Sequence, residues 1–279
     1  MNYPDYVIGL LQKAADKNDA EALFQLGVCY EANYPDKAEE FLRRACELNH
    51  TEAQRLLGKL LLKKGNQDEG VNLLAQIATN GDVSAQSILA EYYFDERKYE
   101  QALVWLKVAA RNKDIRAYYL LSLCYGHGYG VKRDVRKAKD MWEKLSKDTH
   151  YGNSQLAELY RDGGDRIKKD NKKAAEYLAN SIASGNYVNL LDLALMYKCG
   201  GFGLPRSFRN AYLCYYLFDL LVPHNSSTYK LFVCTIESEL PKLAKILSDC
   251  HEGRSIDDLR NQWLPEPVLQ LIKSIPSKS

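Results

Sequence analysis

Residues 117–125 read Ala-Tyr-Tyr-Leu-Leu-Ser-Leu-Cys-Tyr, and residues 22–30 read Ala-Leu-Phe-Gln-Leu-Gly-Val-Cys-Tyr. Both stretches begin with alanine and carry leucine four residues later, a small residue five later and tyrosine eight later. Residues at these spacings lie on one face of an α-helix. The return of one helical pattern at distant places indicates a chain built from internal repeats.

The pattern occurs six times. We call the first small residue of each copy its anchor. The anchors are Ala22, Ala53, Ala85, Ala117, Gly152 and Asn189. Successive anchors lie 31, 32, 32, 35 and 37 residues apart. A second series of small residues lies between them: Ala38, Gly70, Ala102, Ala138, Ala174 and Ala211. Bulky residues follow the second series at helical spacing, so each repeat is predicted as helix A, a turn and helix B. Such pairs bury their apolar faces by stacking on their neighbours.

The two turns of a repeat differ in length. The last marker of helix B comes seven residues after the small residue of the second series; these markers are Ala45, Ile77, Ala109, Leu145 and Ser181. Each lies 8 residues before the next anchor except Leu145, where the distance is 7, so this turn is predicted to be fixed in length. The connection from helix A to helix B is about five residues longer in the last three repeats. Those connections are rich in glycine, which tolerates positive φ, and cover residues 126–131, 162–165 and 199–205. The change divides the array at about residue 117.

Residues 121–138, Leu-Ser-Leu-Cys-Tyr-Gly-His-Gly-Tyr-Gly-Val-Lys-Arg-Asp-Val-Arg-Lys-Ala, resemble a Sel-one-like repeat. The family pattern is a Leu-Gly pair, a Tyr, a Gly-x-Gly-Val loop, an Asp, then Lys-Ala and a Trp. Trp105 fits that spacing and Trp142 lies one place late, while the first three repeats lack the glycine loop and resemble tetratricopeptide repeats. The resemblance covers roughly residues 5–222. It implies an all-α fold, a right-handed α-solenoid of antiparallel helix pairs that binds proteins, and no catalytic residues.

The ends of the chain fit this scheme. Residues Val7, Leu10, Leu11 and Ala14 match helix B markers, so the chain is expected to open on a half repeat. The period fades after about Leu221. We expect a repeat region at 1–222 and a C-terminal helical cap at 223–279, with helical stretches at Tyr229–Glu239, Lys242–Cys250 and Pro267–Ile275 separated by prolines.

Composition limits the classes of function. The net charge is +2 with 27% charged residues, which gives no strong attraction to nucleic acid. There is no apolar stretch of membrane-spanning length, so we expect no membrane partner. The N-terminal residues show no secretory signal, and whether one was removed stays open. The seven cysteines are an odd number without a repeating interval or Cys-x-x-Cys spacing, which favours free thiols in the cytoplasm over disulfides or zinc.

Catalytic and cofactor sites find little support. The Gly-His-Gly-Tyr-Gly run at 126–130 follows a predicted helix rather than a strand, so it is interpreted as a structural turn and not as a phosphate loop. The five histidines are scattered among different repeats. We therefore predict no enzyme activity, no catalytic residues, no metal and no cofactor; an enzyme or a cofactor-binding subunit is the alternative of another class.

Two segments are basic. Residues 126–145 contain six basic residues (Lys or Arg) and three acidic residues (Asp or Glu), and so do residues 161–175. Each segment therefore has a net charge of about +3. They lie one repeat apart and are expected to form a ridge. The two interpretations are a solvated loop edge and a surface for an acidic partner; nucleic acid is less favoured, because no set of aromatic residues is interleaved with the charges.

The inner face of such an array is lined by helix A. Positions one before the anchor and two, six and nine after it are predicted to face inward in tetratricopeptide-like stacking. The predicted protein-binding residues are Arg55, Lys59, Glu91, Arg116, Tyr119, Glu158, Arg161 and Lys198, and Phe94 and Tyr151 lie at the same positions. Arg116 and Tyr119 are the strongest candidates, since Arg and Tyr are favoured at interfaces.

The sequence thus predicts a cytoplasmic, non-enzymatic scaffold or adaptor that binds a protein or peptide on its concave helical surface. A narrower alternative is a regulatory or immunity protein that binds and inhibits a bacterial toxin or effector.

Overall fold

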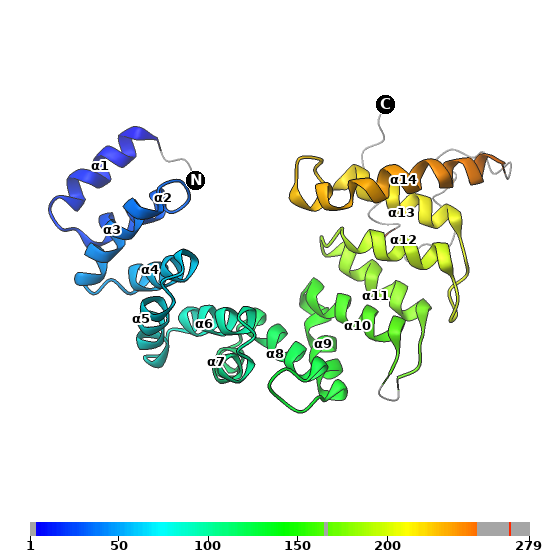
Figure 1. Cartoon of the computed structure of the whole chain (residues 1–279), viewed down its shortest axis with the longest axis horizontal. Coiled ribbons are helices and arrows are strands. Elements are labelled where there is room, and N and C mark those ends of the chain that lie inside the picture. The colour runs from blue at the N-terminus through cyan, green and yellow to red at the C-terminus, as the bar shows by residue number, and fades with distance from the viewer. Residues whose placement is uncertain (1–3, 165–166, 250–267, 269–279) are drawn as a thin grey trace. The chain divides into compact units, whose positions relative to one another are not determined.

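The computed structural model describes residues 4–164, 167–249 and 268. In these residues the chain is all-α, as predicted, and within each of its two units successive helices are antiparallel neighbours (Figure 1). The described helices are α1 (Asp5–Ala15), α2 (Ala20–Tyr30), α3 (Pro35–Glu47), α4 (Thr51–Lys64), α5 (Gln67–Thr79), α6 (Val83–Asp95), α7 (Tyr99–Arg111), α8 (Ile115–His127), α9 (Val135–Asp148), α10 (His150–Asp162), α11 (Asn171–Ala183), α12 (Asn189–Cys199), α13 (Phe208–Leu221) and α14 (Ser227–Asp249).

The chain divides into two compact units, Met1–Asp134 and Val135–Ser279. Unit 1 holds α1 to α8, and unit 2 holds α9 to α14. The division falls in the connection between α8 and α9, a little after the change in loop length that the sequence places near residue 117. Each unit is a stack of helix pairs around its own apolar core.

The predicted repeat markers form these cores. All six anchors are buried, as are the leucines four residues after them and the small residues five after them. The second series of small residues is buried as well. Among the tyrosines at the eighth position, Tyr197 is fully buried, whereas Tyr30, Tyr93, Tyr125 and Tyr160 are half-buried. The helical periods read from the sequence are therefore confirmed.

Glycine permits the closest helix contacts. A Cβ added to Gly27 would lie 2.5 Å from Leu42, and one added to Gly58 would lie 2.6 Å from Leu74. Both leucines come from helix B of the same repeat and are fully buried. A small residue five positions after the anchor is thus required by the packing of helix A on helix B.

The fixed turn between helix B and the next helix A has a common construction in unit 1. The residue four before the anchor has positive φ in each copy: Asn18, Asn49, Gly81 and Lys113. The next residue, Asp19, His50, Asp82 or Asp114, caps helix A by accepting a hydrogen bond from the anchor amide. Because each turn consists of a left-handed residue followed directly by a side-chain cap, its number of residues is fixed. This explains the constant spacing between helix B and the next anchor.

The longer connections of the last three repeats are closed by one recurring hydrogen bond. The carbonyl oxygens of Tyr125, Tyr160 and Tyr197 accept from the backbone amides of residues 134, 170 and 207, each at 2.8 Å. In the first loop, Gly128 and Gly130 have positive φ and the Tyr129 ring stacks on Tyr99 at 4.6 Å. This loop is a packed turn between two helices, as the sequence indicates.

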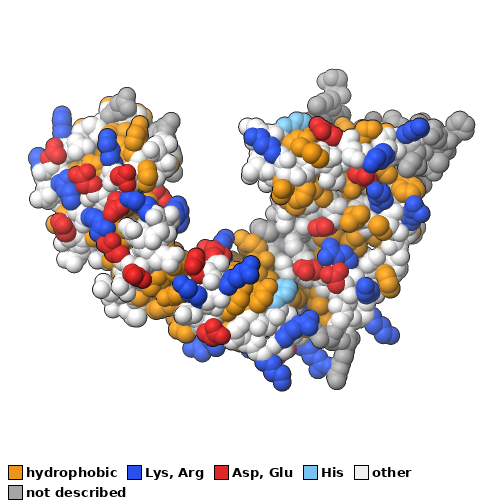
Figure 2. Space-filling view, viewed as in Figure 1, with side chains coloured by type: hydrophobic (Ala, Val, Ile, Leu, Met, Phe, Trp, Pro, Cys, Tyr) orange, Lys and Arg blue, Asp and Glu red, His pale blue; other side chains and the backbone are white. Residues whose placement is uncertain are grey.

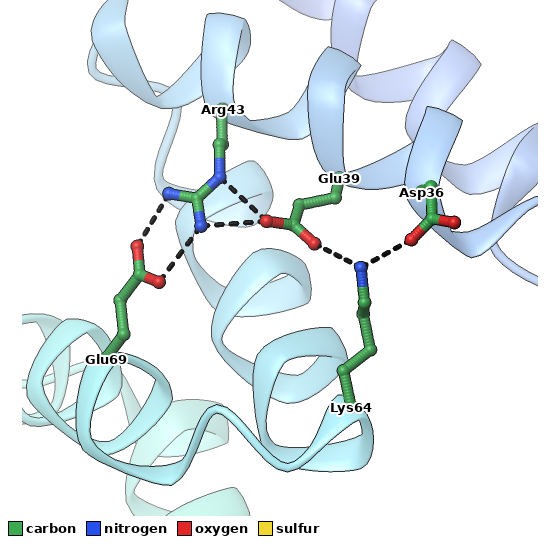
Figure 3. Close-up of polar contacts among 5 residues, drawn as sticks. All are labelled: Asp36, Glu39, Arg43, Lys64 and Glu69. Carbon is green, nitrogen blue, oxygen red and sulfur yellow. Dashed lines mark hydrogen bonds and ion pairs between the residues drawn. The ribbon is translucent and has the colours of Figure 1, made fainter.

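Charged side chains join successive repeats in unit 1. Arg43 of α3 binds Glu69 of α5 with two hydrogen bonds of 2.6 and 3.0 Å and also contacts Glu39 (Figure 3). Lys64, at the end of α4, binds both Glu39 and Asp36 at 2.6 Å. These contacts hold the pKa of Glu39 below its usual range, with the Lys64 hydrogen bond as the largest cause. The network links α3, α4 and α5 on the side of helix B.

The C-terminal region differs from the prediction. The stretches Tyr229–Glu239 and Lys242–Cys250 were expected to be separated by Pro241, but α14 continues through this proline. Proline removes one helical hydrogen bond, yet Ile236 and Leu243 on either side are buried against α13, and this packing favours a continuous helix. A cap at 223–279 stays a proposal; most of Pro267–Ile275 lies outside the described residues.

The half repeat at the start is confirmed in outline. Helix α1 packs on α2, with Ala15 buried and Leu11 and Ala14 partly buried against the first core. Leu10, however, is 61% exposed, although the sequence groups it with the apolar markers. Leu10 is therefore not part of the first apolar core, in contrast to Leu11 and Ala14.

Candidate protein-binding surface

The A helices of unit 1 form one layer. Successive A helices α2, α4, α6 and α8 approach one another more closely than successive B helices do in the described part of this unit, although Arg43 of α3 reaches Glu69 of α5. The layer of A helices is therefore the tighter, inner one. Acidic and basic side chains are interspersed over unit 1 in the space-filling view (Figure 2). Five of the predicted protein-binding residues belong to this layer.

Arg55 of α4 is held by the next A helix. Its guanidinium lies 3.1 Å from Asp82, which caps α6, and 3.5 Å from Glu52 on its own helix. The arginine side chain keeps 26% of its surface exposed. Lys59, one turn further along α4, is exposed and forms no ion pair with another residue of the described ranges. The positive charge of Arg55 is therefore held by carboxylates, whereas that of Lys59 is exposed to solvent.

Arg116 of α8 pairs with Glu91 of α6, so these two predicted residues do meet. The Arg116 side chain is 59% exposed and that of Glu91 is 32% exposed. Burial raises the pKa of Glu91, and the charge of Arg116 opposes that shift. Tyr119 is half-buried one turn after Arg116. Phe94 is turned to packing, since its ring meets Tyr99 edge-on at 5.5 Å.

Unit 2 has a small cavity on its A helices. It measures about 130 Å³ and lies between α10, α11 and α12. Its lining is Ser154, Gln155, Ala157, Glu158, Arg161, Leu178, Asn189, Asp192 and Met196, which includes two of the predicted residues. Arg161 binds Asp162 at 3.0 Å and approaches Asp192 at 3.8 Å. Tyr151 is half-buried on α10, outside the cavity lining.

The cavity wall is polar and ordered by hydrogen bonds. The Asn189 amide donates to the Ser154 hydroxyl at 2.9 Å, and that hydroxyl lies 3.0 Å from the Ser181 hydroxyl. Burial raises the pKa of Asp192, while Arg161 acts in the opposite direction. The wall thus presents two carboxylates, Glu158 and Asp192, beside one guanidinium.

Lys198 is placed differently from the other predicted residues. It projects from α12 to Glu239 of α14, with the ammonium and carboxylate 2.5 Å apart. This contact lowers the pKa of Glu239. Lys198 therefore joins the last predicted A helix to the C-terminal helix.

Sequence reasoning missed the acidic partners of these cations. Asp82, Asp192 and Glu239 lie outside the inward positions, and each comes from a different helix than the cation it holds. The cap position of Asp82 could have been found, since acidic residues recur three places before the anchors at 19, 82 and 114. Nothing in the local pattern marks Glu239, which follows the last repeat.

The first basic segment is divided between the units. Residues 126–134 belong to unit 1 and residues 135–145 to unit 2, so the expected ridge stays a prediction. Lys132, Arg136 and Lys137 are exposed. Arg133 donates to the Gly126 carbonyl at 3.0 Å and so contributes to its own loop.

Two of the buried or partly buried thiols are held in the protonated form. Six cysteines within the described ranges are free thiols, and Cys250 lies outside these ranges. Burial raises the pKa of Cys46 and of Cys124 to about 11, which keeps both protonated at neutral pH. Within the described ranges no cluster of three His, Cys, Asp or Glu side chains could hold a metal ion. No described helix is both long and apolar enough to cross a membrane.

The repeat pattern matches a known family. A family model for the Sel1 repeat fits residues 20–50, 83–114, 115–150, 150–186 and 190–218, together more than half of the chain. The chain belongs to the Sel1 repeat family. The repeat anchored at Ala53 falls between the matched segments; it has leucine in place of the marker tyrosine and glycine at the start of the second series.

Curated relatives share the repeats over part of their length. The Sel1 chain is 32% identical to the F-box protein At1g70590 of Arabidopsis thaliana over 103 residues, which are 36% of this chain and 29% of that protein. It is 28% identical to the uncharacterised protein NMB1327 of Neisseria meningitidis serogroup B over 200 residues, 67% of this chain and 41% of that one. The chain thus spans less than half the length of these relatives.

Solved Sel1 structures share the fold. The protective antigen c5321 of uropathogenic Escherichia coli, which has an SLR fold, superposes with a TM-score of 0.62 at 22% identity, over 76% of this chain and 48% of that one. A Sel1 repeat protein from Oxalobacter formigenes gives 0.58 at 22% identity, over 77% of this chain and 96% of that one. At this identity the likeness concerns the helical repeat fold alone.

Proposed function

We propose that this Sel1 chain is a non-enzymatic scaffold or adaptor that binds a protein or peptide on the face of its A helices. One recurring observation carries the proposal. Arginines on three A helices, Arg55, Arg116 and Arg161, each pair with a carboxylate from a neighbouring A helix and keep between 26% and 59% of the side chain exposed.

Such arginines are suited to recognition. A guanidinium has five N–H donors in a fixed fork, and a carboxylate that holds one edge leaves others for a partner. Because the side chain is already positioned, less conformational entropy is lost on binding. Exposed but held arginines beside a tyrosine are typical of interface anchors.

The cavity of unit 2 adds a subsite to this proposal. Its volume suits the end of one polar side chain rather than a cofactor, and its wall offers both donors and acceptors. Binding of an acidic partner, a cytoplasmic location and a regulatory or immunity role toward a bacterial toxin are narrower forms of the proposal. The exposed thiols of Cys199 and Cys234 support a reducing compartment.

The test is affinity capture from the native host followed by quantitative mass spectrometry. The variant Arg116→Glu with Tyr119→Ala changes the A-helix face of unit 1. The matched control, Lys107→Glu with Val104→Ala, changes exposed residues on helix B of the preceding repeat. We expect a partner that is retained by the wild type and the control but lost by the A-face variant, with unchanged helicity by circular dichroism. Equal recovery by both variants would place the bound surface elsewhere.

A further inference from the structure

Phe202 has an unusual place in the connection between α12 and α13. Gly201 and Leu204 exchange both backbone hydrogen bonds, at 2.8 and 3.0 Å, so Phe202 and Gly203 are the central residues of a two-residue hairpin. Their φ angles are +47° and +87°, the pattern of a type I′ turn. Asn, Asp or Gly is favoured at the first position, and an aromatic residue there is strained.

This strain is not offset by burial, because the Phe202 side chain is 62% exposed. The other non-glycine residues with positive φ in the described ranges are Asn, Arg and Lys, whose polar side chains belong at the surface. An exposed apolar ring on a strained backbone contributes little to the stability of the fold. Such positions are concentrated at binding and catalytic sites.

The hairpin is nevertheless held firmly in unit 2. The backbone amide of Asn171, the first residue of α11, donates to the Phe202 carbonyl at 2.9 Å. The Asn171 side-chain amide donates to the Gly200 carbonyl at 3.3 Å, and Asn171 itself is buried. Figure 1 shows the connection between α12 and α13 running beside the one between α10 and α11. The ring is therefore presented at a defined place over the start of α11.

The equivalent aromatic residue of an earlier repeat is used for packing. Tyr129 precedes Gly130 as Phe202 precedes Gly203, but its ring stacks on Tyr99 at 4.6 Å. Tyr99 lies three residues before its helix B marker, and the residue at that position in the later repeat is Asn171. Asparagine offers no ring for Phe202 to stack on. The ring on which Tyr129 stacks thus has no counterpart in the repeat that precedes Phe202.

The segment beside the exposed ring is rich in lysine. Residues 167–173 hold four lysines and one aspartate, a net charge of +3. Lys169 lies over the Phe202 ring with its nitrogen 5.5 Å from the ring centre, and the hairpin at Gly203 runs beside Lys172. Lys168 and Lys172 are exposed and form no ion pair with another residue of the described ranges.

The acidic residue of this segment is already engaged. Asp170 caps α11 by accepting from the Lys173 amide at 3.0 Å, and its carboxylate lies 3.8 Å from the Lys173 ammonium. Negative charge from a partner would therefore meet three remaining lysines that form no ion pair within the described ranges.

We propose that Phe202 with Lys168, Lys169 and Lys172, here named the Phe202 patch, is a docking site for an acidic protein segment that carries an apolar side chain. The ring supplies the anchor for the apolar side chain, and the lysines bind carboxylates around it. A single-stranded nucleic acid is less well matched. Such strands stack successive bases on several exposed rings, whereas the nearby Tyr160 and Tyr177 are half-buried and stack on each other at 5.7 Å.

This site is independent of the A-helix face, because it uses none of the paired arginines. A negative result for the Phe202 patch would therefore leave the proposed binding on the A-helix face unaffected. A negative result for the A-helix face would likewise leave the Phe202 patch unaffected. The probes are a fluorescent Glu/Ser peptide with one central Trp, the same peptide without Trp, a Gln/Ser peptide with Trp, and a single-stranded RNA of equal charge. Binding to the full chain is followed by fluorescence anisotropy.

Two variants separate binding from stability. Phe202→Asn puts a favoured residue into the turn, so we expect an equal or higher melting temperature together with at least about tenfold weaker binding of the Trp-containing acidic peptide. The double variant Lys169→Glu with Lys172→Glu should weaken binding of the same peptide by a similar factor. The matched controls are Leu231→Asn, an exposed apolar residue of α14, and Lys144→Glu, an exposed lysine of α9.

The expected order of affinity is the acidic peptide with Trp, then the acidic peptide without Trp, then the neutral peptide, with binding weakened by salt. Several results would overturn the assignment: no saturable binding of the acidic peptide, equal binding by Phe202→Asn and the wild type, or a stronger response to RNA than to the peptide. A fall in the melting temperature of Phe202→Asn would contradict the strain argument.

Discussion

Gly152 offers the sharpest test of the packing argument. It is the anchor of the fifth repeat and the third residue of α10, where the helix crosses α9. A Cβ at this position would overlap the Trp142 carbonyl oxygen and lie 2.5 Å from the Ser146 amide nitrogen and 2.9 Å from Leu145 Cβ. Two of these three atoms belong to the backbone of α9, so no side-chain rotation can remove the overlap.

The free energy of unfolding should therefore fall in the Gly152→Ala variant. Overpacking costs about 1–3 kcal/mol, and the upper part of that range applies where the neighbour is backbone. Alanine gains at most about 1 kcal/mol of helix propensity over glycine, and less in the first turn of a helix. The overlap outweighs the gain in helix propensity, so the free energy of unfolding should fall by about 2 kcal/mol.

Two further glycines provide a graded series. Gly27→Ala meets only the Leu42 side chain, which can shift, so the expected loss is smaller, about 1 kcal/mol. Gly9 lies within α1, exposed, with nothing within 4 Å of an added Cβ, so Gly9→Ala should be stabilising by about 0.5–1 kcal/mol.

Urea denaturation followed by circular dichroism measures the order of the three variants. Hydrogen exchange read by mass spectrometry localises the loss, which for Gly152→Ala should be greatest in the amides of α9 and α10. An unchanged midpoint for Gly152→Ala, or a smaller loss than for Gly27→Ala, would refute the close approach of these two helices.

Three other perturbations test separate features. Ala102→Trp places a large ring at a fully buried position of α7 and should destabilise by roughly 1–3 kcal/mol; an unchanged melting temperature would refute its assignment as a helix-seam residue. Asp82→Ala removes the cap of α6, whose bond to the Ala85 amide is 2.7 Å long, and should cost about 1 kcal/mol in urea denaturation, whereas the neutral cap in Asp82→Asn should retain most of the stability. The pKa of Glu39 is lower in the folded chain than the ordinary value of 4.5, so its contribution to stability is present above pH 4.5 and is lost as the pH falls through the folded value. Stability measured against pH should fall less steeply below 4.5 in Glu39→Gln than in the wild type; parallel curves would exclude Glu39 as a contributor.

The agreement between prediction and structure depends on how local each feature is. The repeat anchors and the constant length of the turn were predicted from spacing alone, because the residues that set them lie close together in the sequence. The structure added the left-handed residue and the capping side chain of that turn. The course of α14 was not predicted, because Pro241 signals a break locally while Ile236 and Leu243 gain their burial from α13.

The candidate surface was predicted only in part. Helical offsets placed Arg55, Arg116 and Arg161 on A helices, where the structure has them. Their carboxylate partners come from other repeats, and long side chains on neighbouring helices can pair in many ways that the offsets do not distinguish. The Glu91–Arg116 pair joins two predicted residues that the sequence treats as separate contacts.

By itself, the sequence of this Sel1 chain determined the number of repeats, the order of helix A and helix B, and the positions of the glycine loops, since all of these follow from spacing along one chain. Only the tertiary structure decided which charges are held in pairs and which aromatic rings are available. Tyr129 and Phe202 occupy matching loop positions, yet the first stacks on Tyr99 and the second lies exposed above Asn171. The physical reason is that the environment of a loop residue is set by the preceding repeat, which lies about thirty residues away in sequence and within hydrogen-bonding distance in space.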